Sequence, residues 1–242
     1  MIDYYTPSAE FYDLIARRHA ASSLPPLRRV LADVDPAHGP ILEIGAGTGR
    51  VTEAVAAALP EARILAAEPS APMRAQLTAR VARNPDLRRR VTVTDGSAQR
   101  MPFPDSISAV VLFGVAGHLT QVERTALWRR LAERLPPGGR IIVELMGPAT
   151  PRVIPSTLSL TETIGEQTYE WWIGAEPAGP DALRFTTTWK ILRGGRVVRE
   201  LSDGYLWHTL DTARLAHESG LAAQRITEAG SGAVPELAVL RT

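Results

Sequence analysis

The chain has 242 residues and a formal net charge of only +1, with 27 Lys and Arg against 26 Asp and Glu. This balance excludes partners that bind mainly through charge, such as nucleic acid or an acidic membrane surface. The absence of cysteine excludes disulfides, thiolate metal sites and a thiol nucleophile, and we expect no metal site of another kind. Acidic residues precede any long apolar run and no apolar stretch reaches membrane-spanning length, so we expect a cytoplasmic protein without a signal peptide.

The first 35 residues predict two helices, because their apolar side chains recur at helical spacing. The first helix begins at Pro7 and places Phe11 and Ile15 on one face. The second helix follows the Pro25–Pro26 pair.

The most informative stretch is residues 41–50, which read ILEIGAGTGR. An apolar run is followed by Gly45, Gly47 and Gly49, and then by a segment of helix formers that Pro60 closes. This order predicts a buried strand, a tight turn and a helix. Glycines let the backbone bend sharply and let a ligand approach without a Cβ in the way. Open α/β sheets bind ligands at this carboxyl end of their strands, beside a helix N-terminus.

The glycine spacing differs from the dinucleotide fingerprint G-x-G-x-x-G, because the third glycine falls one residue early and Arg50 takes its place. With Glu43 inside the strand, E-x-G-x-G-x-G resembles the first motif of class I S-adenosylmethionine (SAM)-dependent methyltransferases. The resemblance implies that Glu43 steadies the loop or meets the amino group of the ligand. It also implies that the methionine part of the ligand is cradled by Gly45, Ala46, Gly47 and Gly49. The alternative is an ordinary strand-to-helix turn.

A second part of the resemblance lies in the first helix, where AEFYDLIA is similar to the N-terminal "YD" helix of many small-molecule methyltransferases. It implies that Tyr12 closes over the cofactor. The alternative is that Tyr12 only packs on the domain.

The second predicted strand, residues 63–67, ends at Glu68, about twenty residues beyond the glycine loop as in α/β units that bind a ribose. A carboxylate there can accept hydrogen bonds from both ribose hydroxyls, which SAM and NAD share. Pro69 then opens the next helical segment, and the resemblance places Met73 against the adenine. The alternative for Glu68 is an acid on the surface at the end of a strand.

The third predicted strand, residues 91–94, is followed by Asp95, Gly96, Ser97 and Ala98. This segment resembles the pattern "GDA..LPFPD" of the same family, in which the acid reads the adenine amino group. Ser97 stands where the family usually has Asp. Asp95 could therefore substitute, or the backbone N–H of Ala98 could make the adenine contact alone. Both Asp95 and Ser97 are kept as candidates for this position.

Residues 107–113 form a continuous apolar run, typical of a central parallel strand that is buried on both faces. The resemblance places the end of this strand, at Phe113, beside the sulfonium, and His118 resembles a histidine often found at this spot. A base there could remove a proton from a hydroxyl or amine substrate, a role for which Tyr12 and His208 also qualify. The alternative is that His118 caps or orients the loop. A helix is expected around residues 124–135, and a fifth strand over residues 141–144.

From Ser156 to about His208, β-branched and aromatic residues alternate, which predicts an antiparallel subdomain inserted after the fifth strand. Gly194 and Gly195 predict a two-residue hairpin turn. Trp171 and Trp172 must point to opposite faces, so we expect one of them to face the substrate cleft and the other not to. Tyr205 and His208 are the polar candidates for substrate contact. The alternative is that the tryptophans form the core of the insertion or a dimer contact.

The last part of the chain predicts a helix over residues 209–219, which Gly220 ends. Two strands follow, over residues 221–227 and 236–241. The fold class is therefore α/β, with a seven-stranded, mostly parallel, doubly wound sheet and an antiparallel insertion. We divide the chain into a SAM-binding core with its N-terminal helices (1–146), an inserted substrate subdomain (147–208) and the last helix and strand pair of the core (209–242).

The leading hypothesis is a SAM-dependent methyltransferase that moves the sulfonium methyl to an N, O or C nucleophile of a small molecule, such as an apolar, aromatic or natural-product-type metabolite. Its cofactor would be SAM, and its partners a small-molecule substrate and a second copy in a homodimer, without nucleic acid or membrane. One alternative is a nicotinamide-dependent oxidoreductase, against which Arg50 and the helical segment ahead of the first strand argue. The other is a protein that binds SAM for a role other than methyl transfer.

Overall fold

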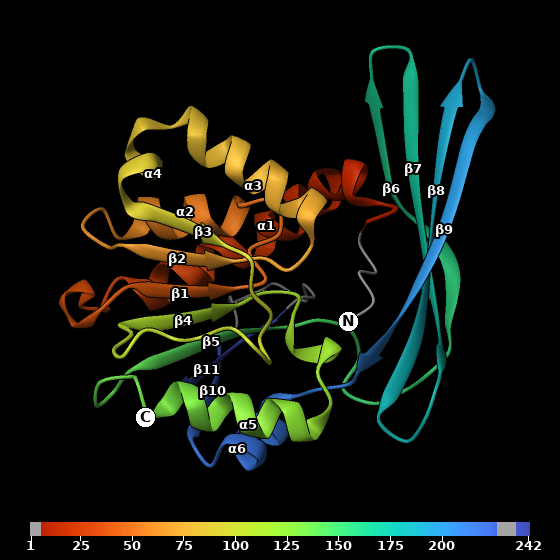
Figure 1. The fold of residues 1–242 in the computed structure, drawn as a ribbon. Coiled ribbons are helices and arrows are strands. Elements are labelled where there is room, and N and C mark those ends of the chain that lie inside the picture. Colours follow the sequence, from red (N-terminus) through yellow and green to blue (C-terminus); the bar gives the residue numbers. More distant parts are fainter. Residues whose placement is uncertain (1–5, 227–235) are drawn as a thin grey trace.

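The computed structural model describes residues 6–226 and 236–242, which form two separate β-sheets with helices packed on the larger one (Figure 1). The larger sheet has seven strands in the order β10-β11-β5-β4-β1-β2-β3. Its strands are β1 (Ile41–Ile44), β2 (Ile64–Ala67), β3 (Val91–Thr94), β4 (Ala109–Leu112), β5 (Arg140–Leu145), β10 (Ala222–Ile226) and β11 (Glu236–Arg241). Only β11 runs antiparallel, to both β5 and β10, which confirms the predicted mostly parallel sheet.

The strand order reverses at β1, which pairs with β2 on one side and with β4 on the other. Chain connections therefore leave this point in opposite directions and open a crevice at the carboxyl ends of the two strands. Such a crevice is the usual ligand site of an open α/β sheet. The glycine loop follows β1 directly, so the fold puts it in that crevice.

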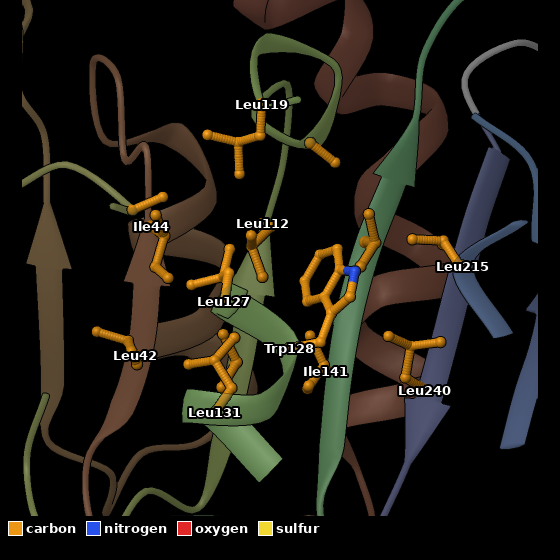
Figure 2. Close-up of a cluster of buried hydrophobic side chains, with 14 of the residues drawn as sticks. Leu42, Ile44, Leu112, Leu119, Leu127, Trp128, Leu131, Ile141, Leu215 and Leu240 are labelled. Atoms are coloured by element: carbon orange, nitrogen blue, oxygen red, sulfur yellow. The ribbon is translucent and has the colours of Figure 1, made fainter. Parts of the chain in front are cut away.

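Helices cover both faces of the seven-stranded sheet. The helical elements are α1 (Ala9–Leu31), α2 (Arg50–Ala58), α3 (Ala71–Arg83), α4 (Pro85–Arg90), α5 (Gln121–Ala132), α6 (Thr212–Ser219) and the 3-10 turns η1 (Pro36–His38) and η2 (Ala116–His118). One hydrophobic cluster packs the four helices α1, α2, α3 and α4 on one face of the sheet. A second cluster packs α5 and α6 on the other face. Figure 2 shows the second cluster, in which Trp128 and Leu131 of α5 lie against Leu42, Ile141 and Leu240 of the strands.

The prediction of two N-terminal helices was wrong, because α1 is one continuous helix with Pro25 and Pro26 inside it. A proline in a helix interior removes a backbone hydrogen bond and crowds the preceding turn, at a cost of ~3 kcal/mol. That cost is offset here by burial, since Leu27 and Leu31 have no solvent exposure. Tertiary packing therefore overrides the local signal of the prolines.

The second sheet confirms the predicted antiparallel insertion. It has the order β6-β7-β8-β9, with β6 (Ile154–Ile164), β7 (Gln167–Pro177), β8 (Ala182–Arg193) and β9 (Arg196–His208), and it begins two residues before the predicted Ser156. The predicted hairpin turn is present, since Arg193 pairs with Arg196 and the intervening Gly194 and Gly195 have φ of 57° and 75°. The sheet lies at one end of the larger sheet, and its hairpins extend beyond the rest of the molecule (Figure 1).

The last elements also follow the prediction closely. Helix α6 starts three residues later than predicted, because the Asp211 side chain accepts a hydrogen bond from Arg214 N and caps it, and Gly220 ends it with a φ of 67°. Strand β10 spans most of the predicted residues 221–227, of which Thr227 lies outside the described residues, and β11 has the predicted bounds. None of the described helices combines the length and apolar character needed to cross a membrane.

Candidate functional site

The three glycines of the loop after β1 all have positive φ, of 75°, 56° and 88°. The side chain that lies nearest to each glycine is different. A Cβ on Gly45 would overlap Cγ2 of Val115, and one on Gly49 would lie 2.6 Å from Cδ1 of Leu77. Gly49 is therefore needed for packing against α3. A Cβ on Gly47 would meet only Tyr12, at 3.8 Å from its Cε1. The open side of the loop is thus at Gly47, beneath the Tyr12 ring.

Glu68, at the end of β2, ties this loop to the neighbouring strand. Its Oε2 accepts a hydrogen bond from the backbone N–H of Gly47 at 2.8 Å, and its Oε1 accepts one from the N–H of Ser70, also at 2.8 Å. The side chain is buried and lines a cavity, where its carboxylate oxygens are of the acceptor type that a ligand hydroxyl needs. The acid predicted to bind a ribose therefore also holds the glycine loop in shape.

The carboxyl ends of β1, β2 and β4 and the loop after β3 enclose a cavity of about 310 Å³, which we call the loop cavity. Most of the predicted cofactor residues line its wall. Those that line it are Gly45, Gly47, Glu68, Pro69, Met73, Gly96, Ser97, Ala98 and Phe113, together with Tyr12 and His118.

Four predicted cofactor residues lie outside the loop cavity. Gly49 faces α3, and Ala46 lines a separate small pocket of about 70 Å³ between the glycine loop and α1. The Asp95 side chain is 73% exposed and lies 3.4 Å from Nη1 of Arg74. Of the two candidates Asp95 and Ser97, only Ser97 lies on the wall of the loop cavity. Glu43, the fourth residue, is buried in β1 behind the loop.

The Glu43 carboxyl group accepts a hydrogen bond from Oγ1 of Thr52 in α2 at 2.6 Å. This contact joins the strand before the glycine loop to the helix after it. Of the two roles that the resemblance implies, steadying the loop is thus the one that the geometry supports. Burial raises the pKa of Glu43 to about 8, so the group is mostly protonated at pH 7.

This pKa predicts how stability depends on pH. The folded-state value lies above the ordinary 4.5 of a glutamate, so the contribution of Glu43 is full below about pH 4.5 and is lost as pH rises through about 8. Glu43→Gln should therefore fold, and its melting temperature relative to wild type should increase between pH 5 and pH 8. A difference in melting temperature between the two proteins that stays constant from pH 5 to pH 8 would contradict a protonated Glu43.

A charged network holds α1 over the glycine loop. The Asp13 carboxylate accepts hydrogen bonds from Oγ1 of Thr48 at 2.7 Å, from Nε of Arg50 at 2.8 Å and from Nη2 of Arg80 at 2.9 Å. Arg50, which breaks the dinucleotide fingerprint, thus fixes the segment that carries Tyr12. The sequence marks Asp13 only as the neighbour of Tyr12, and its three partners lie 35 to 67 positions away.

A second cavity, of about 270 Å³, lies between α1 and the inner face of the four-stranded sheet, and we call it the aromatic cavity. Its rings come from Trp171, Phe185, Trp189, Tyr205 and Trp207, and its polar side chains include His19, Thr187 and Asp203. The predicted substrate residues Trp171 and Tyr205 therefore share one cavity.

The other two predicted substrate residues lie away from it. Trp172 points to the opposite face of the sheet, where its Nε1 donates to Glu170 at 3.0 Å and Lys190 lies over its ring. His208 lies beyond both cavities, with its Nδ1 3.8 Å from the Asp181 carboxylate. Of the two adjacent tryptophans, only Trp171 therefore lines the aromatic cavity.

The loop cavity and the aromatic cavity meet at Tyr12 and Gly114, which line both. The His118 ring lies at the same place, with its centroid 4.9 Å from that of Trp207 and 5.3 Å from that of Tyr205. Burial lowers the pKa of His118 to about 4 and raises the pKa of both Tyr12 and Tyr205. At neutral pH the histidine is therefore an uncharged proton acceptor, whereas the two tyrosines are proton donors.

The residues at this site that were not singled out from the sequence include His19, Gly114 and Asp203. Asp203 has the same strand parity as Tyr205 and Trp207, so a period-two reading of β9 could have found it. His19 lies four residues after Ile15 and eight after Phe11, so helical spacing on α1 could have placed it on the same face as these two buried residues.

The fold and the domain type have known counterparts. Residues 41–139 match a family model described as "Methyltransferase domain". Streptomyces venezuelae DesVI is similar in structure, with 22% identity, a TM-score of 0.76 and coverage of 96% of this chain and 97% of DesVI. CalS10, an amino pentose methyltransferase from Micromonospora echinaspora, has 19% identity and a TM-score of 0.73, over 95% of this chain and 96% of CalS10. The sugar N-methyltransferase KedS8 from a Streptoalloteichus species has 19% identity and a TM-score of 0.72, over 95% of this chain and 92% of KedS8.

No curated protein sequence matches the chain significantly. The structural matches extend over the four-stranded sheet as well as the core, because they cover nearly the whole chain. Residues 41–139 therefore resemble a methyltransferase domain, and the chain as a whole shares the fold of the solved structures that it matches, among them the methyltransferases CalS10 and KedS8.

Proposed function

We propose that this protein is a SAM-dependent methyltransferase that acts on a small molecule held in the aromatic cavity. The observation that carries the proposal is that two cavities meet at Tyr12 and Gly114. One is bounded by a glycine loop and a ribose-type acid, and the other by aromatic rings. Methyl transfer needs this arrangement, because a cofactor and an acceptor must approach each other in line within a dry site.

The loop cavity fits SAM on the chemistry of its walls. Glu68 would accept the ribose hydroxyls, Met73 would pack on the adenine, and Ser97 with the Ala98 backbone would meet the adenine edge. The bare face of Gly47 would admit the methionine part beneath Tyr12. When bound, SAM supplies a methyl group on a positively charged sulfur that is already an activated leaving group.

The chain itself then needs to position the acceptor and to remove one proton. Tyr12 and Tyr205 can orient the acceptor through their hydroxyls, and the neutral His118 can accept the proton. The rings of the aromatic cavity exclude water from the point of transfer. In the described part of the chain, no group of three or more His, Cys, Asp or Glu is arranged to hold a metal ion.

The nucleophile that we favour is a nitrogen. CalS10 is described as an amino pentose methyltransferase and KedS8 as a sugar N-methyltransferase, and MtfA, with 20% identity and a TM-score of 0.57, as a glycopeptide N-methyltransferase. An amine loses a proton when it is methylated, which gives His118 a role. Oxygen and carbon acceptors remain alternatives.

The binding experiment is isothermal titration with SAM, with S-adenosylhomocysteine (SAH) and with NAD. We expect the first two to bind at one site per chain and NAD not to bind. NAD binding in place of SAM would instead support the nicotinamide-dependent oxidoreductase. Incubation with SAM and candidate amines, followed by mass spectrometry, should give a product heavier by one methyl. SAM binding without transfer to any acceptor class would favour the third hypothesis, a SAM-binding protein with another role.

His118 gives a more specific prediction. His118→Gln should lower kcat about 100-fold, as expected when a general base is lost, while the Kd for SAM stays nearly unchanged. Because the pKa of His118 is about 4, wild-type kcat/KM should show no loss from this group until the pH falls below about 5. The matched control is His208→Gln, outside both cavities, which should keep wild-type kcat. Full activity of His118→Gln would show that the histidine only orients the loop.

A further inference from the structure

Asp203 stands out among the described residues that line the aromatic cavity, because it is the only acid there and the cavity walls include no Lys or Arg. One carboxylate oxygen, Oδ1, accepts a hydrogen bond from the backbone N–H of Gly204 at 2.7 Å. The other oxygen, Oδ2, is shielded from solvent and has no hydrogen-bond partner in the described part of the chain. A buried carboxylate oxygen without a donor is costly, so a ligand that supplies the donor is favoured.

The walls around Asp203 favour the same kind of ligand. The rings of Trp171, Trp189 and Tyr205 line the cavity with it, and the faces of aromatic rings attract cations. His19, on the same cavity, has its pKa lowered by burial and by the Arg18 charge, so it is uncharged at neutral pH. The aromatic cavity therefore carries one negative charge and no positive one.

The position of Asp203 separates it from the point of methyl transfer. It is two residues from Tyr205 along β9, on the same face, which corresponds to about 7 Å along the strand. Tyr205 contacts His118, whereas Asp203 pairs with Thr187 further from η2. An ammonium paired with a carboxylate is also held in its protonated form, which has no lone pair to attack a methyl group. The group bound at Asp203 is thus an anchor and not the methyl acceptor.

We propose that Asp203 is a specificity-determining residue that binds an ammonium group of the substrate, at a distance from the atom that is methylated. This inference rests on the proposed function and names its substrate class. The substrate is a small cationic molecule with an apolar or aromatic body, one protonated amine and a second, separate nucleophile. Thr187 and the tryptophan rings enclose the anchored end, and Tyr12, Tyr205 and His118 surround the reacting end.

The test uses benzylamine and benzyl alcohol, which have the same body and differ in the charged group. Their affinities for the SAH-loaded full chain are compared by ligand-observed NMR titration, in wild type and in Asp203→Asn. Asparagine keeps an oxygen for the Gly204 N–H, so the strand should fold as before. The matched control is Glu170→Gln, which removes an acid from the opposite face of the same sheet, beside Trp172.

Wild type and Glu170→Gln should bind benzylamine at least about tenfold more tightly than benzyl alcohol, and Asp203→Asn should lose this preference. Equal binding of the two probes by wild type would overturn the proposal. So would an unchanged preference in Asp203→Asn, and so would an equal loss in Glu170→Gln, which would indicate a general charge effect. SAH affinity is measured on the same samples. Failure to bind SAH would contradict the proposed function, whereas the probe comparison in the aromatic cavity tests Asp203 by itself.

Discussion

Gly47→Val is expected to abolish SAM binding, with a rise in Kd of at least about 100-fold, while the protein stays folded. A valine Cβ at this position meets only the Tyr12 ring, so the fold can accept it, but its two methyl groups would occupy the space beneath that ring. The substitution also places a β-branched residue at a φ of 56°, which strains the loop whose N–H donates to Glu68. Isothermal titration with SAM measures the affinity, and circular dichroism confirms the fold.

Gly165→Val is the matched control for this prediction. Gly165 has a φ of 60°, in the hairpin between β6 and β7, and a Cβ there meets nothing within 4 Å. The control therefore imposes a similar backbone strain far from the loop cavity, and SAM affinity should stay at the wild-type level. Equal affinities in both variants would remove Gly47 from the cofactor site.

Of the substitutions proposed for this protein, Arg124→Met is expected to lower the free energy of unfolding the most. The guanidinium of Arg124 and the carboxylate of Glu218 join α5 to α6 with two hydrogen bonds of 2.7 Å and 2.6 Å, and neither side chain has any solvent exposure. Removing one partner leaves the other as an unpaired buried charge, which costs about 3–5 kcal/mol. For a chain of this size we expect a melting temperature lower by roughly 10 °C in calorimetry.

Two further variants separate the effect of burial from the effect of the ion pair itself. Arg124→Met combined with Glu218→Leu removes both charges and should recover most of the lost stability, because apolar residues can replace a buried pair. Arg199→Met breaks the exposed pair between Arg199 and Glu10, whose side chains are 50% and 49% exposed, and should hardly change the melting temperature. A double variant as unstable as Arg124→Met alone would contradict this account.

The parts of the fold that the sequence predicted well are those that local pattern determines. The bounds of β3 and β11 agree with prediction, because each strand shows as a short run of β-formers in the sequence. The Gly194–Gly195 turn was equally clear, since positive φ at two successive positions restricts the residue types. The Pro25–Pro26 pair misled because the burial that keeps α1 continuous comes from strands and helices far along the chain.

The candidate site shows the same limit in finer detail. Gly45, Gly47 and Gly49 look equivalent in the motif, yet Gly49 faces Leu77 of α3, a neighbour that only the folded chain supplies. Strand parity could place Trp171 and Trp172 on opposite faces but could not say which face is covered. Likewise, only the structure shows that the Asp95 side chain is exposed beside Arg74, whereas Ser97 lies on the wall of the loop cavity.

The central claim is that an adenosyl-sulfonium ligand binds in the loop cavity with its sulfur at the junction with the aromatic cavity. A crystal structure of the protein with SAH tests it most directly. We predict the ribose hydroxyls on Glu68, the methionine part against Gly47, and the sulfur beside Tyr12 and Gly114. SAH bound elsewhere, with Glu68 and Gly47 untouched, would contradict the claim.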